Sequence, residues 1–175
     1  DFIKISSDAG VDYIYITTNG ALADIEKMKE LIALGLNSIK FSINAGTKET
    51  YRLIHGKDDF DKVVKNVRDL KKYRDSDAPH VRLMASFVAT SFSDDEVEIW
   101  KEEVVPYVDD AKIMGVHGQM GQALSHLHLM ESKLATSYPE PGEAKPCHML
   151  WDRIHLTQEG YLTLCCVDYE NVLTY

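Results

Sequence analysis

Four short apolar segments, separated by amphipathic helix patterns, constrain the fold of this chain more than any other feature. The segments are rich in β-branched and aromatic residues, which is typical of buried strands. Between them, apolar residues recur three and four positions apart, which predicts helices with one buried face. Strands that alternate with helices in this way predict an α/β fold with a parallel sheet. The expected strands are 13–16, 38–43, 81–88 and 110–116, and the expected helices are 22–34, 50–53, 60–70 and 97–104.

Local signals mark the points where several of these helices begin. Thr47 is a candidate N-cap for the second expected helix, and Asp59 opens the third. Ser93 is followed three residues later by Glu96, which is a capping-box pattern. This pattern predicts that both side chains bond to the first turn of the fourth helix.

The composition changes after residue 117. Residues 118–146 are rich in Gly and Pro and show little periodicity, which predicts a connector. Residues 151–156 then alternate, Gly160 marks a turn and residues 161–165 return, which is typical of a β-hairpin. We therefore expect three parts, namely a βα body over 1–117, a linker over 118–146 and a second domain that begins with a hairpin over 147–175.

Charge and cysteine content exclude several classes of protein. The 175 residues carry 19 basic and 28 acidic side chains, and a net charge of −9 disfavours nonspecific binding to nucleic acid. No run of about 18 apolar residues is present to span a membrane. Three cysteines are too few for a disulfide scaffold, so we expect a reducing, cytoplasmic location. The chain begins without Met at Asp1 and is expected to be a fragment.

Polar or small residues follow each expected strand. Side chains alternate along a strand, so Ser42 and Asn44 should lie on one side and Ile43 on the other. Because parallel strands end at one edge of a sheet, these groups could bind a sugar hydroxyl or an amino-acid zwitterion there. Ordinary turn chemistry is the alternative, since Thr, Asn and Gly are common in any loop.

The cysteines and histidines give a second candidate site. Cys147 and Cys165 flank the expected hairpin, which would bring both sulfurs toward one soft metal ion or cluster. Cys166 adjoins Cys165 and is expected to face the opposite way, so at most one of the two joins Cys147. The alternative is that these cysteines are buried small apolar residues. His126 and His128 could form a further metal pair, although surface positions are the simpler interpretation.

Several of these segments together resemble the radical S-adenosylmethionine (radical SAM) enzymes. The segments on which the resemblance rests are Thr18-Asn19-Gly20 after the first strand, Ile39 to Asn44 on the second, Glu49 to Gly56, and Phe60 to Val64. Cys147, twelve residues, Gly160, four residues and Cys165 resemble the opening of the SPASM extension. The resemblance implies a partial (β/α) barrel over 1–117 and the beginning of a SPASM-like iron–sulfur domain over 147–175.

The resemblance also implies an activity and a set of binding residues. Members of the family reductively cleave S-adenosylmethionine (SAM) at a [4Fe-4S] cluster and remove a substrate hydrogen through a deoxyadenosyl radical. His55 lies near the position where many relatives place an Arg that grips the cofactor carboxylate, and Asn44 replaces a frequent Asp. The implied SAM-binding residues are Asn19, Ser42, Asn44, His55 and Thr90, and the implied ligands of an auxiliary cluster are Cys147 and Cys165.

One departure from the family limits what the chain alone is expected to do. The cluster-binding loop Cys-x3-Cys-x2-Cys is not in the sequence, and neither is the Gly-Gly-Glu segment. We expect the fragment to be inactive alone, and the parent to use a flavodoxin or ferredoxin as reductant and a small-molecule or peptide substrate. Open sheet edges would favour self-association.

Two alternatives to a radical SAM enzyme remain. The chain could be a non-catalytic βα binding module that lost the cluster loop, or a different βα enzyme of the aldolase or phosphate-binding kind. A Cys-x3-Cys-x2-Cys motif about 60 residues upstream of Asp1, the size of two βα units, would favour the radical SAM enzyme over the binding module.

Overall fold

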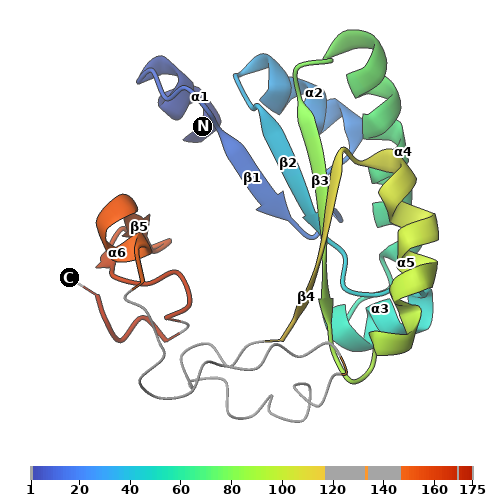
Figure 1. Cartoon of the computed structure of the whole chain (residues 1–175). Coiled ribbons are helices and arrows are strands. Elements are labelled where there is room, and N and C mark those ends of the chain that lie inside the picture. The colour runs from blue at the N-terminus through green and yellow to red at the C-terminus, as the bar shows by residue number, and fades with distance from the viewer. Residues whose placement is uncertain (1, 117–132, 134–146, 169, 175) are drawn as a thin grey trace.

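A four-stranded parallel sheet with helices against one face forms the body of the protein (Figure 1). The computed structural model describes residues 2–116, 133, 147–168 and 170–174. The strands lie in chain order, and each pairs in parallel with the next. The predicted α/β class with a parallel sheet is therefore confirmed. The strands are β1 (Tyr15–Thr18), β2 (Ser38–Ser42), β3 (Arg82–Ala89) and β4 (Asp110–Gly115).

The helices that follow the strands begin near the predicted positions. The Asp24 side chain caps the first of them by accepting from Lys27 N, and Thr47 caps the next by accepting from Thr50 N. Asp59 precedes the longest helix but makes no side-chain capping bond. The helices are α2 (Ile25–Ala33), α3 (Lys48–His55), α4 (Phe60–Asp77) and α5 (Val97–Val104), with 3-10 turns η1 (Asp94–Glu96) and η2 (Val105–Tyr107) around α5.

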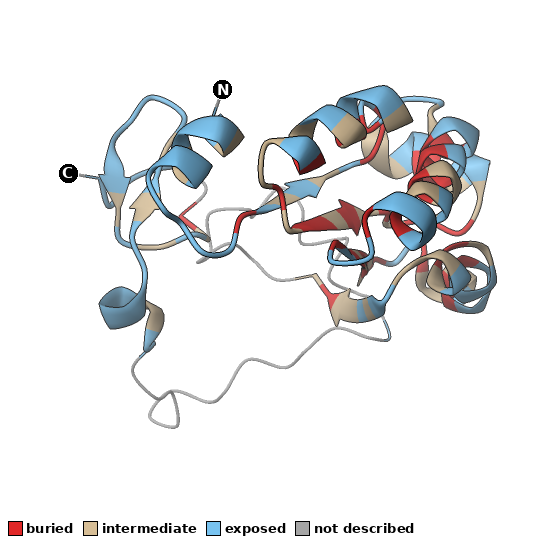
Figure 2. Ribbon diagram, turned by 90° about the horizontal axis from the view of Figure 1, so that it is seen from above, coloured by how far each residue is buried: buried red, intermediate tan, exposed pale blue. Residues whose placement is uncertain are grey.

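The core lies between the sheet and these helices (Figure 2). Side chains alternate along β2, so that Ile39, Phe41 and Ile43 are fully buried while Ser42 and Asn44 are half-buried on the other side. Trp100 of α5 packs against Phe87 of β3 with ring centroids 5.4 Å apart. Among the described residues, no helix packs against the opposite face of the sheet (Figure 1).

The C-terminal part contains the predicted hairpin, but the hairpin is shorter than expected. Trp151 and Asp152, predicted as strand residues, end the short helix α6 (Met149–Asp152) instead. The strands β5 (His155–Leu156) and β6 (Leu162–Thr163) pair antiparallel. The buried Asp168 carboxylate accepts from Val172 N and Leu173 N, and these bonds hold the turn that follows β6.

A short N-terminal helix, α1 (Phe2–Asp8), was not predicted from the sequence. No residue of α1 is buried, and Phe2 and Ile5 are exposed, so it shows no apolar face that a periodicity test could detect. No helix within the described residues is long and apolar enough to cross a membrane.

Candidate functional site at the carboxyl edge of the sheet

Three loops meet at the carboxyl edge of the sheet, and we call them the rim: residues 18–20 after β1, 42–46 after β2 and 90–93 after β3. Because the strands are parallel and in register, Thr18 pairs with Phe41 and Ser42 pairs with Ser86. The structure therefore brings three of the predicted loops to one edge. The end of β4 reaches the same edge, but His117 and the loop after it lie outside the described residues.

The first rim loop is closed by its own side chains. Thr18 Oγ1 accepts from Gly20 N at 3.1 Å, and the exposed Asn19 accepts from Ala21 N at 3.1 Å through Oδ1. The buried Asn66 amide of α4 donates to Gly20 O at 2.9 Å. Asn19 thus lies at the rim, where its NH₂ group is the part that can face a ligand.

Ser42 and Asn44 share the uncovered side of β2, as the alternation predicts. The Oγ atoms of Ser42 and the buried Ser86 lie 3.4 Å apart. Asn44 Oδ1 accepts from Val88 N at 2.9 Å, which continues the β2–β3 pairing one residue past Ile43. An Asp could accept this bond equally well. The Asn44 NH₂ group, however, adds a donor, so it would donate to a ligand oxygen where an Asp would accept.

Thr90 is at the rim, but its hydroxyl is directed into its own loop. Thr90 Oγ1 lies 3.0 Å from Ser93 Oγ and accepts from Phe92 N at 3.3 Å, while Ser93 Oγ accepts from Thr90 N at 3.1 Å. Thr90 and Ser93 are both buried. These bonds fix the shape of the loop, and they do not test a binding role for Thr90.

His55 lies at the end of α3, where its ring stacks on Tyr51 with centroids 4.2 Å apart. Burial lowers the pKa of His55, so the neutral imidazole is favoured. Its Nε2 atom is buried without a hydrogen-bond partner in the described part of the chain. A neutral His55 could offer a ligand carboxylate a hydrogen bond but not the positive charge of the Arg found in relatives. No contact with the rim is seen for His55 among the described residues.

The capping box predicted for Ser93 and Glu96 is wrong, because both side chains bond elsewhere. Ser93 turns back to Thr90, and Glu96 reaches across to the loop after β2. The Glu96 carboxylate accepts from Gly46 N at 2.8 Å, Thr47 N at 3.1 Å, Thr47 Oγ1 at 2.6 Å and Thr50 Oγ1 at 2.7 Å. Glu96 therefore joins two rim loops.

The charge on Glu96 is stabilised by these contacts. Burial raises the pKa of the Glu96 carboxyl, but the hydrogen bonds from Thr47, Thr50 and the Gly46 backbone outweigh burial and lower it below the usual value. Glu96 lies in η1, just after the rim, and it is the residue supporting the rim that sequence reasoning missed. Its partners are 46 to 50 positions away, so no local spacing could have indicated them.

The three cysteines lie around one apolar cavity of about 450 Å³ in the C-terminal part. Cys147 and Cys165 both line this cavity, as their predicted joint role requires. Cys166 lines it too, contrary to the prediction, because β6 ends at Thr163 and strand alternation does not extend to the turn that contains Cys166. Within the described residues, no group of three or more His, Cys, Asp and Glu side chains is placed to hold a metal. His126 and His128 lie outside the described residues.

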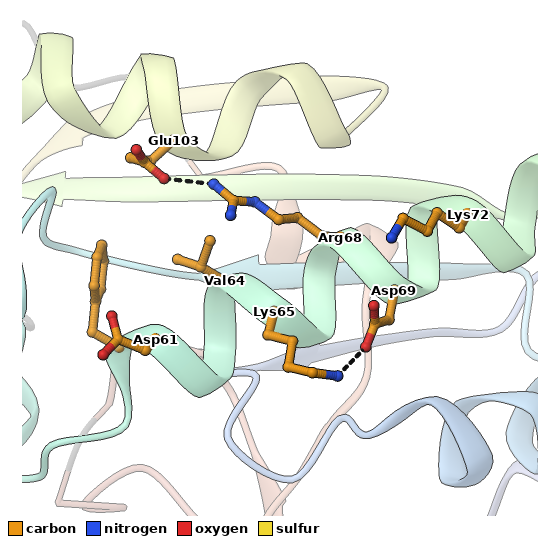
Figure 3. Close-up of a pocket in the computed structure, with 8 residues that line it drawn as sticks. Asp61, Val64, Lys65, Arg68, Asp69, Lys72 and Glu103 are labelled. Carbon is orange, nitrogen blue, oxygen red and sulfur yellow. Dashed lines mark hydrogen bonds and ion pairs between the residues drawn. The ribbon is translucent and has the colours of Figure 1, made fainter.

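A second concave surface, of about 330 Å³, lies on the outer helices, away from the rim (Figure 3). Its charges largely neutralise one another. Lys65 pairs with Asp69 along α4, and Arg68 pairs with Glu103 of α5 at 2.7 Å. These ion pairs join the helices α4 and α5 to one another and leave little free charge for a ligand. The rim is therefore the better candidate for a ligand site.

A parallel βα sheet with a polar carboxyl edge is the arrangement in which many α/β proteins bind small ligands. Comparison with known proteins narrows this class. The sequence model of the Radical SAM superfamily matches residues 1–85, a little under half of the chain. The matched segment includes Asn19, Ser42, Asn44 and His55, whereas Thr90 and the cysteines lie beyond it.

A relative of unknown function also matches. The uncharacterized protein MJ0804 of Methanocaldococcus jannaschii is 31% identical over 111 residues. These residues are 63% of this chain and 36% of the relative, so the chain matches little more than a third of that protein's length.

Proposed function

We propose that the chain is part of a radical SAM enzyme and that the rim binds SAM through Ser42, Asn44 and Asn19. The observation that carries the proposal is the superfamily match over residues 1–85, which includes these three residues. When bound beside a reduced [4Fe-4S] cluster, SAM supplies a deoxyadenosyl radical that removes a hydrogen from a substrate. Superfamily membership implies SAM and this cluster, whereas the substrate and product are open.

The residues of the rim suit SAM, but those of the chain do not suit the main cluster. Ser42 contributes a hydroxyl, and Asn44 contributes an NH₂ donor whose carbonyl is already bonded to Val88 N. These groups can orient ribose hydroxyls or the amino-acid part of the cofactor. The main cluster needs three closely spaced thiolates, and the chain has only Cys147, Cys165 and Cys166, all in its C-terminal part. Residues outside this chain would have to hold it.

Titration of the 175-residue chain with SAM by calorimetry tests the proposal. We expect saturable binding to the wild type and at least about fivefold weaker binding to Ser42→Ala and Asn44→Ala, because each loses one hydrogen bond to the ligand. Ser76→Ala is the matched control, since Ser76 is an exposed serine of α4. Equal affinity of Ser42→Ala and Ser76→Ala would remove Ser42 from the site.

We further propose that Cys147 and Cys165 hold part of an auxiliary iron–sulfur cluster in a SPASM-like domain. The shared cavity supports this proposal. Anaerobic reconstitution with iron and sulfide should give a brown protein, and Cys147→Ser and Cys165→Ser should each lower its iron content. Cys166→Ser is measured beside them, because Cys166 lines the same cavity, and Ser76→Ala on α4 is the control that should keep its iron. An iron-free wild type, or an unchanged iron content in Cys147→Ser and Cys165→Ser, would contradict the assignment.

A non-catalytic βα binding module is the second candidate function, and a Cys-x3-Cys-x2-Cys motif upstream of Asp1 in the full protein would decide against it. Either function requires a small-molecule or peptide ligand, and only the enzyme requires a reductant such as flavodoxin or ferredoxin. In both cases the edge strands β1 and β4 are open to self-association. Light scattering at high protein concentration tests this, and a purely monomeric chain would count against it.

A further inference from the structure

The uncovered face of the sheet is more polar than the covered face. The covered face consists of apolar side chains packed on the helices. On the uncovered face, Ser42 at the rim, Ser86 of β3 and Lys112 of β4 stand side by side in register, and Lys40 lies two residues before Ser42 on β2. The same face also carries the apolar residues Met84, Val88 and Met114.

Positive charge is concentrated on this face although the chain as a whole is acidic. Strand alternation places Lys40, Arg82 and Lys112 on it, against the single carboxylate of Asp110. Lys40 and Lys112 have no ion-pair partner within the described residues.

Lysines on the helices are partly paired. Lys29, Lys65 and Lys101 each pair with a carboxylate one turn away on the same helix, whereas Lys62 has no ion pair among the described residues. What distinguishes Lys40 and Lys112 is therefore their place on a sheet face beside hydroxyl side chains. Their ammonium groups remain available to a ligand.

The hydroxyl pair lies next to Lys112 in the sheet, and Lys40 lies two residues before Ser42 on β2. Ser86 is only 2% exposed, and its Oγ atom is 3.4 Å from Ser42 Oγ. Lys112 lies opposite Ser86 on the next strand, and the backbones of neighbouring strands are about 4.8 Å apart. An ammonium beside two hydroxyl donors is a combination that binds carboxylate or phosphate oxygens.

We infer that the uncovered face binds an anionic group, a carboxylate or phosphate, of the small molecule on which the protein acts. Lys40 and Lys112 supply the charge, and the buried Ser86 positions the half-buried Ser42 hydroxyl beside them. The assignment of this group to the substrate rests on the proposed function, in which the rim holds SAM above it. The anion site itself rests only on the residues of the uncovered face.

A structural role for the lysines explains only part of the arrangement. Lysine on an edge strand protects a sheet from unwanted pairing, and β4 is an edge strand in the described sheet. This accounts for Lys112 but not for Lys40, because β2 lies between β1 and β3 and both of its edges are paired.

Titration of the full chain with inorganic phosphate at constant ionic strength, followed by amide NMR, tests the inference. We expect the amides of Ser42, Ser86 and Lys112 to shift along one saturable curve. Lys40→Gln and Lys112→Gln should each weaken phosphate binding about fivefold or more, because each removes a charge-assisted bond. Lys62→Gln, which removes an exposed lysine of α4, is the matched control and should bind phosphate like the wild type.

The contrary outcomes are distinct. Shifts spread over the helices, or an equal loss of affinity in Lys62→Gln, would show an adventitious ion only and overturn the inference. If Lys112→Gln weakened SAM binding as much as phosphate binding, the lysine would serve the cofactor carboxylate, which also overturns it. Phosphate binding without SAM binding would support the anion site and refute the proposed function. SAM binding without phosphate binding would refute the anion site alone.

Discussion

Replacing Glu96 by Gln should loosen the rim, because one carboxylate holds the loop after β2 to the loop after β3. Each oxygen of Glu96 accepts two hydrogen bonds, Oε2 from Gly46 N and Thr47 N and Oε1 from Thr47 Oγ1 and Thr50 Oγ1. Glutamine keeps one accepting oxygen and turns an NH₂ group toward two donors. Two bonds to a charged acceptor are therefore lost, and we expect a destabilisation of about 2–3 kcal/mol.

Thermal unfolding and amide exchange measure this effect. A loss of 2–3 kcal/mol should lower the Tm by roughly 5–10 °C in a chain of this size. The amides of Gly46 and Thr47 should also exchange faster than in the wild type. Glu103→Gln is the matched control, because its ion pair with Arg68 is solvent-exposed and contributes about 0.5 kcal/mol.

The dependence on pH gives an independent check. The folded-state pKa of Glu96 is below its usual value, so the bonds stabilise the fold fully above the ordinary glutamate pKa of about 4.3. This contribution is lost as the pH falls through the lowered pKa. The Tm difference between wild type and Glu96→Gln should therefore shrink in acid. A constant difference from pH 7 to about pH 3, or a loss no larger than that of Glu103→Gln, would refute the reasoning.

Two further substitutions test other contacts. Asp109→Asn should cost about 2–3 kcal/mol in chemical unfolding, because it removes the carboxylate that accepts from Arg74 Nη1, leaves the buried guanidinium with the carboxylate of Asp75 and weakens the bond to Leu83 N; Asp110→Asn, an exposed neighbour, should cost little. Gly46→Ala should cost about 1–3 kcal/mol by calorimetry, because a Cβ atom there would lie 2.7 Å from the carbonyl oxygen of Glu96, and an unchanged Tm would show that the loop can move away.

Periodicity predicted most of the fold because the core of an α/β layer is itself periodic. Val63, Val67 and Leu70 of α4 recur at helical spacing and are almost fully buried against the sheet. The same test failed for α1, which reaches the core only through the half-buried Ile3, and for Trp151, whose alternating neighbours form a helical turn before the hairpin. In both segments the local pattern is not set by burial in a core.

Only the residues of the candidate site that lie at the ends of strands could be predicted from the sequence. The positions of Ser42 and Asn44 follow from alternation and from parallel strands ending together. The bond from Val88 N to Asn44 does not, because it joins residues 44 positions apart. Glu96 was misread for the same reason: its spacing from Ser93 fits a local cap, while its true partners lie on another βα unit.

These long-range bonds make the rim one physical unit, although the superfamily match ends within it. Asn66 holds the loop after β1 through Gly20 O, and Glu96 holds the loop after β2. Glu96 lies beyond residue 85, where the match ends, yet its carboxylate bonds to Gly46 and Thr47 inside the matched segment. The loops are thus fixed before any ligand binds, which reduces the entropy cost of ordering them around it. A ligand at the rim would meet a preformed surface to which both parts of the chain contribute.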